Sequence, residues 1–222
     1  DSKVPDTPDS IFPNNWISFH QKGTVDLYPM FAKNRRFERR NDILDIVEKK
    51  GFVIKNIIDY TSAEDENIFL EGAGSLILDR INRKAYCALS PRADEGLFIE
   101  FCEDFEYTPV LFHAYQTVNG ERKLIYHTNV MMAISEKSVI ICLDAITDKK
   151  ERKNVIRHLK EDGKEIITIL EEQVNHFSGN MLQVIGKKGK RYIVMSKTAF
   201  RCLSKDQIEK IELESKILYS DV

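Results

Sequence analysis

The sequence has no apolar stretch that approaches the roughly 20 residues needed to cross a bilayer as a helix. It also shows no signal-peptide pattern near its first residue. These two absences argue against a membrane protein with helical spans. They predict a cytoplasmic protein with no membrane partner.

Cysteine and histidine are scarce. The four cysteines lie far apart, at positions 87, 102, 142 and 202, and none belongs to a C-x-x-C pair. The five histidines are scattered as well. Zinc ligands occur at close spacing, so the sequence predicts no zinc cluster. Because free cysteine behaves as a small core hydrophobe, we expect reduced, buried thiols.

The chain also lacks a strong excess of one charge, with a formal net charge of −2 over 222 residues. Its composition, 42% hydrophobic and 31% charged, is typical of a soluble globular protein with one large or two small domains. The balanced charge gives no reason to expect nucleic acid as a partner. The one dense basic run, NRRFERR at 34–40, carries its own Glu38 and is predicted to be a solvated helix start.

What the sequence does contain is a repeated order of elements. Strands are predicted at 75–79 and 84–90, an amphipathic helix from Asp94, and a third strand at 109–114. The apolar face of this helix consists of Leu97, Phe98, Phe101, Cys102 and Phe105. The same strand–strand–helix–strand order recurs in the rest of the chain.

Cap residues mark the helices of the other copies: Asp148 with Glu151 and Gly163, Ser204 with Gln207, and Gly51 at the end of a helix predicted over 41–51. Repeats of about 50 to 60 residues favour a radial array of blades over a solenoid. We therefore predict one α/β-propeller domain over 1–222, with ββαβ blades at approximately 11–60, 70–115, 127–170 and 179–222.

In a radial array, the loops before the first strand of each blade converge on the axis. These loops are FPNNW at 12–16, FLEGAGS at 69–75, YHTN at 126–129 and SGNM at 178–181. Their polar residues are Asn14, Asn15, Glu71, His127, Asn129 and Asn180. Polar groups at equivalent positions of successive repeats favour a shared site.

Each of these residues also has a structural explanation. Asn14 and Asn15 suit a turn beside Pro13, His127 suits a hydrogen-bonded structural histidine, and Glu71 suits a cap on a backbone amide. Only their convergence supports a site. A carboxylate that binds N–H donors, beside a histidine that moves protons, suits attack on an sp² carbon bearing nitrogens, with the nucleophile still to be assigned.

The motifs FPNNW, YPMFAKNRRFERR, FLEGAGSLILDR, ALSPRA, YHTNVMMAI and GNMLQV resemble the guanidino-group-modifying (pentein) superfamily. The resemblance is strongest to its amidinotransferase-like citrulline-hydrolase (citrulline ureidase) branch and covers almost the whole chain. It implies a five-bladed ring of ββαβ units around a central active site, with four of the five blades represented here.

The resemblance implies a role for individual residues. Glu71 matches the glutamate of the family's E-G-G motif, which holds substrate nitrogens and moves protons. His127 matches the general acid/base of the H-x-D motif, in which Asn129 replaces the aspartate. Arg92 matches the arginine of an S-x-R element that binds the substrate's α-carboxylate, and Arg36 is a second candidate for that role.

The segment FPNN falls on the F-x-x-D motif of arginine deiminases, whose aspartate holds the guanidinium group; here that position is Asn15. A neutral amide offers donors and an acceptor, so Asn15 and Asn129 suit the neutral ureido group of citrulline. Asn14 and Asn180 are further candidates for substrate binding. The implied reaction converts citrulline to ornithine, CO2 and ammonia through a cysteine thiolate. Arginine deiminase-type hydrolysis and a non-catalytic binding protein are the alternatives.

The resemblance implies no metal or organic cofactor, a small-molecule substrate, and a homodimer as one possible assembly. The family nucleophile lies in a Gly-rich segment near the C-terminus, and none of the four cysteines here lies in an inner loop of a predicted blade. We therefore expect residues 1–222 to be a fragment without the N-terminal element and the nucleophile segment of the fifth blade.

Overall fold

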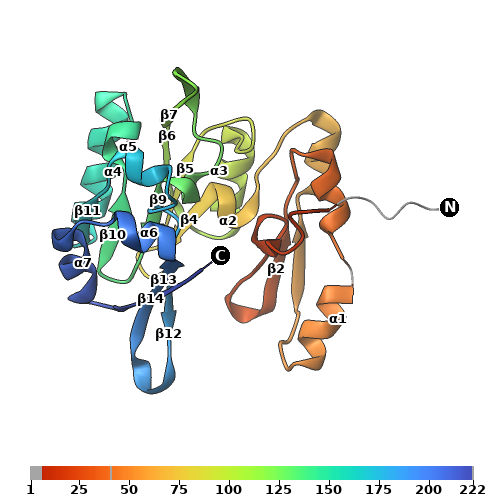
Figure 1. The fold of residues 1–222 in the computed structure, drawn as a ribbon. Coiled ribbons are helices and arrows are strands. Elements are labelled where there is room, and N and C mark those ends of the chain that lie inside the picture. The colour runs from red at the N-terminus through yellow and green to blue at the C-terminus, as the bar shows by residue number, and fades with distance from the viewer. Residues whose placement is uncertain (1–6, 41, 222) are drawn as a thin grey trace.

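The computed structural model describes residues 7–40 and 42–221, and in this part of the chain the strands form four three-stranded sheets and one separate hairpin (Figure 1). Each sheet consists of an antiparallel pair followed by a third strand parallel to the second. A parallel neighbour requires a crossover connection, and in every sheet a helix provides it. Each sheet with its helix is therefore a ββαβ unit.

The first unit contains β1 (Ile17–Phe19), β2 (Thr24–Leu27), α1 (Asp42–Lys49) and β3 (Asn56–Asp59). The second contains β4 (Leu76–Asp79), β5 (Lys84–Ala88), α3 (Glu95–Asp104) and β6 (Thr108–Phe112). The third contains β9 (Met132–Ile134), β10 (Ser138–Ile141), α4 (Lys149–Glu161) and β11 (Glu165–Thr168). The fourth contains β12 (Leu182–Ile185), β13 (Arg191–Ser196), α6 (Lys197–Cys202), α7 (Lys205–Glu212) and β14 (Lys216–Ser220).

Shorter elements connect the units. These are α2 (Gly72–Ser75), α5 (Glu171–Val174), the hairpin of β7 (Tyr115–Val118) and β8 (Glu121–Leu124), and the 3₁₀ turns η1 (Pro13–Asn15), η2 (Gln21–Gly23), η3 (Lys33–Glu38), η4 (Thr61–Glu66), η5 (Thr128–Val130), η6 (Leu143–Ala145) and η7 (Lys187–Gly189). The hairpin projects from the body of the molecule at the top of Figure 1. In the described residues, no helix is both long enough and apolar enough to cross a membrane.

The predicted α/β class is confirmed, and the four units lie within the four predicted blade ranges. Closure of the units into a five-bladed ring stays a prediction. Asn41, the first residue of a predicted helix, and Val222, the last of a predicted strand, lie outside the described residues. The sequence patterns did not predict α5, α6 or the β7–β8 hairpin.

The first strands of the second, third and fourth units lie next to one another in space. Strand β4 packs beside β9, and β9 packs beside β12, while α2 contacts both η1 and η5. The largest hydrophobic cluster runs through the second, third and fourth units, and it includes Tyr86, Phe112, Ile140 and Ile193. The segments before β1 and β9 thus lie against α2, which itself precedes β4.

The helix caps show where local sequence rules hold and where tertiary contacts override them. Ser204 and Gln207 form the predicted reciprocal capping box at the start of α7. Asp148 caps α4 by accepting the N–H of Lys150 and of Glu151. The Glu151 side chain, however, does not complete a box: it accepts the backbone N–H of His113 at 2.7 Å. That part of the prediction is wrong because His113, at the end of β6, competes for the carboxylate.

The basic run at 34–40 is not simply a solvated helix start. Its η3 turn buries Arg35 and Glu38, whose Nε and Oε1 atoms lie 3.0 Å apart. A run of charged residues predicts exposure to water, so the sequence did not indicate this burial. Glu38 neutralises Arg35, and a charge that is paired in this way can be buried.

A second buried ion pair joins the second and third units. The Lys164 Nζ atom lies 2.8 Å from Asp79 Oδ2, and both side chains are buried. Lys164 also donates to the backbone carbonyls of Ser135 and Glu136 at 2.9 and 2.8 Å. The single ammonium group therefore satisfies acceptors from two units.

Candidate active site

Glu71 occupies the centre of the predicted site. It is the N-cap of the short helix α2, in the loop before strand β4, which starts at Leu76. Its side chain is fully buried, and both carboxylate oxygens are engaged. Oε1 accepts the backbone N–H of Phe31 at 2.9 Å, while Oε2 lies 2.5 Å from His127 Nε2 and 3.3 Å from Arg92 Nη1.

These partners control the charge of Glu71. Burial alone would raise the pKa of Glu71, but the hydrogen bond and charge of His127, the charge of Arg92 and the Phe31 amide outweigh burial and lower this pKa below its ordinary value. The carboxylate is therefore ionised at neutral pH. An ionised Glu71 accepts a hydrogen bond from the Nε2–H group of His127, and in the neutral imidazole this leaves Nδ1 as the unprotonated nitrogen.

The backbone around Glu71 is held by two hydroxyl groups. Ser75 Oγ donates to the carbonyl of Arg92 at 2.8 Å and accepts the N–H of Glu71 at 3.2 Å. Thr128 Oγ1 donates to the carbonyl of Ser75 at 2.5 Å and accepts the N–H of Ala88 at 2.8 Å. These bonds connect α2 to the second unit and to the start of η5. They therefore hold the backbone of Glu71, Arg92 and His127 in fixed relative positions.

Two glycines of the EGAG segment permit close approach. Gly72 has a φ of +36°, and a Cβ atom there would lie 2.7 Å from the carbonyl oxygen of Asn14. A Cβ atom on Gly74 would lie 2.9 Å from the His127 ring and 3.0 Å from Asn15 Oδ1. The absence of a side chain at Gly74 therefore lets the Asn15 amide and the His127 imidazole meet above α2.

Gly74→Ala is expected to displace His127 or Asn15, because the added methyl group has no room between them. We expect a loss of activity of about 100-fold, the typical cost of a displacement of about 1 Å in an active site. Steady-state kinetics of the purified variant measure this loss. Gly96→Ala, an exposed glycine of α3, is the matched control and should retain activity; unchanged activity of Gly74→Ala would contradict the assignment of the site to this place.

The other predicted residues lie at the edge of this centre. Asn14 and Asn180 are exposed, and Asn129 is half-buried in η5. Arg36 donates from Nε to the carbonyl of Met30 at 2.9 Å and lies 3.4 Å from a carboxylate oxygen of Glu64. Direct contacts thus join Glu71, Arg92 and His127, and the Asn15 amide lies beside the same glycine, Gly74. The roles of these residues, like those of Asn14, Asn129, Asn180 and Arg36, stay predictions.

Sequence reasoning did not select Phe31 and Tyr126, although both lie at the site. The guanidinium carbon of Arg92 lies 5.6 Å from the centroid of the Phe31 ring and 5.3 Å from that of Tyr126. The centroid of the Tyr126 ring lies 5.0 Å from that of His127. The adjacency of Tyr126 and His127 in YHTN was the one available sequence signal.

In the described residues, none of the four cysteines forms a hydrogen bond with Asn15, Glu71, Arg92 or His127. Cys87 in β5, Cys102 in α3 and Cys142 after β10 are buried in the hydrophobic clusters, as predicted, whereas Cys202 at the end of α6 is half-exposed. Burial raises the pKa of Cys87 and of Cys142, and raises that of Cys102 to about 12. At neutral pH these three thiols are protonated and poorly nucleophilic.

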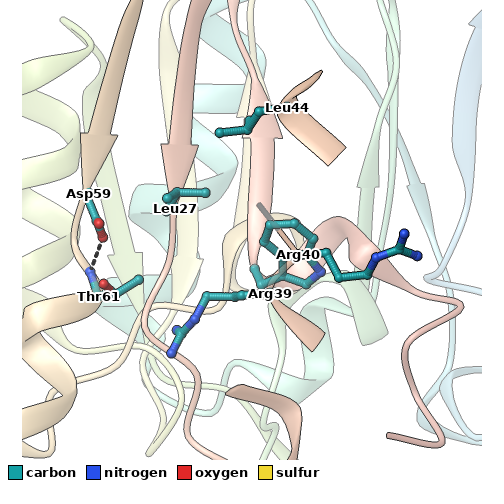
Figure 2. Close-up of a pocket in the computed structure, with 7 residues that line it drawn as sticks. Leu27, Arg39, Arg40, Leu44, Asp59 and Thr61 are labelled. Carbon is teal, nitrogen blue, oxygen red and sulfur yellow. Dashed lines mark hydrogen bonds between the residues drawn. The ribbon is translucent and has the colours of Figure 1, made fainter. Parts of the chain in front are cut away.

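Two cavities elsewhere in the described residues do not include Glu71 or His127 in their linings. One, of about 150 Å³, is lined by Trp16, Leu27, Arg39, Arg40, Leu44, Asp59 and Thr61. Figure 2 shows Arg39 and Arg40 extending in opposite directions there, with Asp59 accepting the N–H of Thr61. The other, of about 530 Å³, lies between α5 and α7. Residues 7–40 and 42–221 contain no group of three or more His, Cys, Asp or Glu side chains arranged to hold a metal ion.

The whole chain, residues 1–222, matches the sequence model of the eukaryotic N,N-dimethylarginine dimethylhydrolase family. No curated protein sequence matches it. Among solved structures, the N-terminal domain of ArgZ, an arginine dihydrolase from the ornithine–ammonia cycle in cyanobacteria, has a TM-score of 0.67 at 16% identity over 100% of this chain and 71% of that one.

Two further structures are similar to the chain. Unliganded AgrE has a TM-score of 0.70 at 16% identity, over 100% of this chain but 28% of its own. DDAH from Pseudomonas aeruginosa, complexed with citrulline, has a TM-score of 0.61 at 14% identity, over 96% of this chain and 70% of that one. At such identities, the similarity of these structures shows a common fold.

Proposed function

Because the chain belongs to the eukaryotic N,N-dimethylarginine dimethylhydrolase family, within the pentein superfamily of guanidino-group-modifying hydrolases, we propose that it hydrolyses a non-peptide C–N bond of a ureido or guanidino amino acid. The substrate we propose is citrulline, which would give ornithine, CO2 and ammonia. The observation that supports this most strongly is the meeting of the buried carboxylate of Glu71, the imidazole of His127 and the neutral amide of Asn15 around Gly74.

The roles follow from the chemistry of these groups. Glu71 holds an N–H of the ureido group, and His127 moves protons between the leaving group and water. Asn15 supplies a neutral donor and acceptor, which match the N–H and C=O groups of an uncharged ureido group, and Asn129 is proposed to do the same. Arg92 receives the α-carboxylate, since it carries a positive charge beside the site.

The proposed reaction begins with attack of a thiolate on the ureido carbon. Ammonia or ornithine then leaves with a proton from His127, and water activated by His127 hydrolyses the covalent thiocarbamate to a carbamic acid, which loses CO2 and so releases the other amine. Because Cys87, Cys102 and Cys142 are buried in hydrophobic clusters and Cys202 lines the α5–α7 cavity, we propose that the thiol comes from a fifth blade outside these 222 residues. A homodimer and a cytoplasmic location also stay predictions.

A second candidate reaction acts on a cationic guanidino group, that of arginine or of an N-methylated arginine. The ionised state of Glu71 favours it, because a carboxylate complements a guanidinium cation. The family match favours it as well. The product in that case would be citrulline, with release of ammonia or a methylated amine.

Incubation of the full-length protein with citrulline, arginine and N,N-dimethylarginine separates these possibilities. Ornithine formed from citrulline supports the proposed function, and citrulline formed from either of the other two supports the second candidate. Saturable binding of citrulline without any product would instead indicate a non-catalytic binding protein. Mass spectrometry of the amino acids and amines provides the measurement.

Asn15→Asp tests the preference for an uncharged substrate. An aspartate would place a second carboxylate near Glu71 and offer no donor to the ureido oxygen. We expect kcat/KM for citrulline to fall by about 5- to 150-fold, equivalent to the roughly 1–3 kcal/mol of an unsatisfied buried polar contact. Asn175→Asp makes the same charge change at an exposed position of the α5 C-cap and should be neutral. Undiminished citrulline turnover by Asn15→Asp would refute the role assigned to Asn15.

A further inference from the structure

Arg92 differs from the nearby arginines in how its guanidinium group is held. Arg35 and Arg39 each donate two hydrogen bonds to one carboxylate, that of Glu38 and that of Glu64. Arg36 donates from Nε to the carbonyl of Met30 and lies 3.4 Å from a carboxylate oxygen of Glu64. Within the described part of the chain, the guanidinium of Arg92 has one hydrogen-bond partner, the 3.3 Å contact from Nη1 to Glu71. Most of its N–H donors are therefore free to bind a ligand.

Two aromatic rings lie close to the guanidinium group of Arg92. The rings of Phe31 and Tyr126 lie 5.6 and 5.3 Å from the guanidinium carbon, within the range of cation–π attraction. Such attraction uses the π-face of the ring and leaves the hydrogen-bonding edge of the guanidinium available. Phe31 and Tyr126 are also 44% and 41% exposed, so this aromatic pair is at the surface rather than in a core.

The Phe31 ring is held at a fixed distance from Glu71. The Phe31 backbone N–H donates to Glu71 Oε1 at 2.9 Å, and its ring packs edge-on against Phe69, with centroids 5.3 Å apart. Phe69 itself is buried. The ring therefore has a rigid support below it and Arg92 beside it.

Tyr126 is coupled to the same arginine through the backbone. Ser90 Oγ donates to the carbonyl of Tyr126 at 2.9 Å and accepts the N–H of Arg92 at 3.1 Å. The next residue, His127, contacts Glu71. The spacing between the Tyr126 ring and the Arg92 guanidinium is thus set by the same segments that set the His127–Glu71 contact.

We propose that Phe31 and Tyr126 are positioning residues that hold the plane of the Arg92 guanidinium so that its free edge receives the α-carboxylate of an amino-acid substrate. This proposal rests on the proposed function, because it assigns the carboxylate subsite of that same site. It makes the aromatic pair a determinant of specificity for amino acids over the corresponding amines. The pair does not touch the bond that breaks.

The test compares two ligands that differ in one group, citrulline and its decarboxylated analogue N-carbamoylputrescine. Their dissociation constants are measured by calorimetry on the full-length protein and on Phe31→Leu, Tyr126→Leu and the double variant. Leucine keeps apolar volume but removes the π-face, so we expect each single variant to weaken citrulline binding by about 2- to 30-fold. Binding of the analogue should stay unchanged.

Two further variants separate positioning from a structural role. Tyr126→Phe keeps the ring and should restore citrulline binding to near the wild-type value. Phe37→Leu removes an exposed ring that lies outside the aromatic pair and should leave the ratio of the two dissociation constants unchanged. Circular dichroism verifies that each variant is folded. If Phe31→Leu does not fold, the comparison of Tyr126→Leu with the wild type is sufficient to test the proposal.

Each outcome is decisive. If the leucine variants bind citrulline more weakly but bind N-carbamoylputrescine as the wild type does, the proposal is supported. Equal loss of affinity for both ligands, or no loss for either, overturns it. A wild-type protein that binds both ligands equally also overturns it. If the wild type prefers citrulline through Phe31 and Tyr126 but forms no product from it, the positioning role stands and the proposed hydrolysis of citrulline fails.

Discussion

Glu71→Gln is expected to reduce turnover of the ureido or guanidino substrate by about 10²- to 10⁴-fold, the usual contribution of a positioned acid or base. The amide oxygen of glutamine can still accept the Phe31 N–H, so this fold-related contact is kept. The amide nitrogen, in contrast, cannot accept a proton, and it would face the donors of His127 and Arg92. The variant should therefore fold but lose both the charge and the proton acceptor of the site.

Steady-state kinetics and thermal unfolding of the same preparation measure this prediction. Glu161→Gln is the matched control, because Glu161 is an exposed residue of α4 that pairs with Arg157; its turnover should stay within about twofold of the wild type, as expected for a surface change. If Glu71→Gln kept wild-type turnover, Glu71 would be a structural carboxylate and the proposed mechanism would be wrong.

The pH dependence of this carboxylate follows from the direction of its shift. The pKa of Glu71 in the folded protein is lowered from 4.5, the value expected for the unfolded chain. Its contribution to stability is therefore fully present above about pH 4.5 and is lost as the pH falls through the lower folded value. Titration of Glu71 should accordingly cause no loss of activity between pH 7 and pH 5, which a pH–rate profile measures.

Lys164→Met is expected to lower the free energy of unfolding by about 3–5 kcal/mol, the typical effect of removing one partner from a buried ion pair. The substitution leaves Asp79 buried without its cation and deprives the carbonyls of Ser135 and Glu136 of a donor. Asn82 still donates to Asp79, but it carries no charge. The contact between the second and third units should therefore weaken.

Urea unfolding at neutral pH measures this loss. Lys160→Met, an exposed position of α4, is the control and should change stability by less than about 0.5 kcal/mol. Adding Asp79→Asn to Lys164→Met should recover part of the loss, because the uncompensated charge is then removed. A loss below about 1 kcal/mol for Lys164→Met would show that Asp79 is solvated in the folded protein, contrary to its burial.

Acid should diminish the difference between the wild type and Lys164→Met. Burial raises the pKa of Asp79, but the hydrogen bonds from Lys164 and Asn82 and the charge of Lys164 lower it from 3.8 overall. The stability that this ionised pair provides is present above about pH 3.8 and is lost as the pH falls through the lower folded value.

The order of elements was largely predictable from the sequence. Short continuous apolar runs in SVIICL and RYIVMS mark strands β10 and β13, and Ser204 with Gln207 marks the start of α7. These signals are local, since a strand or a cap depends on residues within a few positions of one another. The recurrence of polar residues before the first strands also located Asn15, Glu71 and His127.

The contacts of those residues depended on the tertiary structure. The sequence could identify Glu71 as unusual, but its partner at Oε1 is a backbone amide, that of Phe31, which every residue type except proline offers. The Glu151 carboxylate likewise binds the backbone N–H of His113 instead of completing the cap of its own helix, and this requires β6 to lie beside α4. Backbone groups leave no mark in a sequence pattern.

By itself, then, the sequence determined the ββαβ order and the buried thiols of β5 and α3. It also predicted a shared site for Asn15, Glu71 and His127 from their repeat positions, and the family resemblance added Arg92 to that prediction. Only the tertiary structure decided that Gly74 is the point where Asn15 and His127 meet, that Arg35 and Glu38 are buried together, and that Phe31 and Tyr126 flank Arg92. The physical reason is that periodicity and capping act within one element, whereas ring faces, buried charges and close backbone approaches join segments that are distant in the chain.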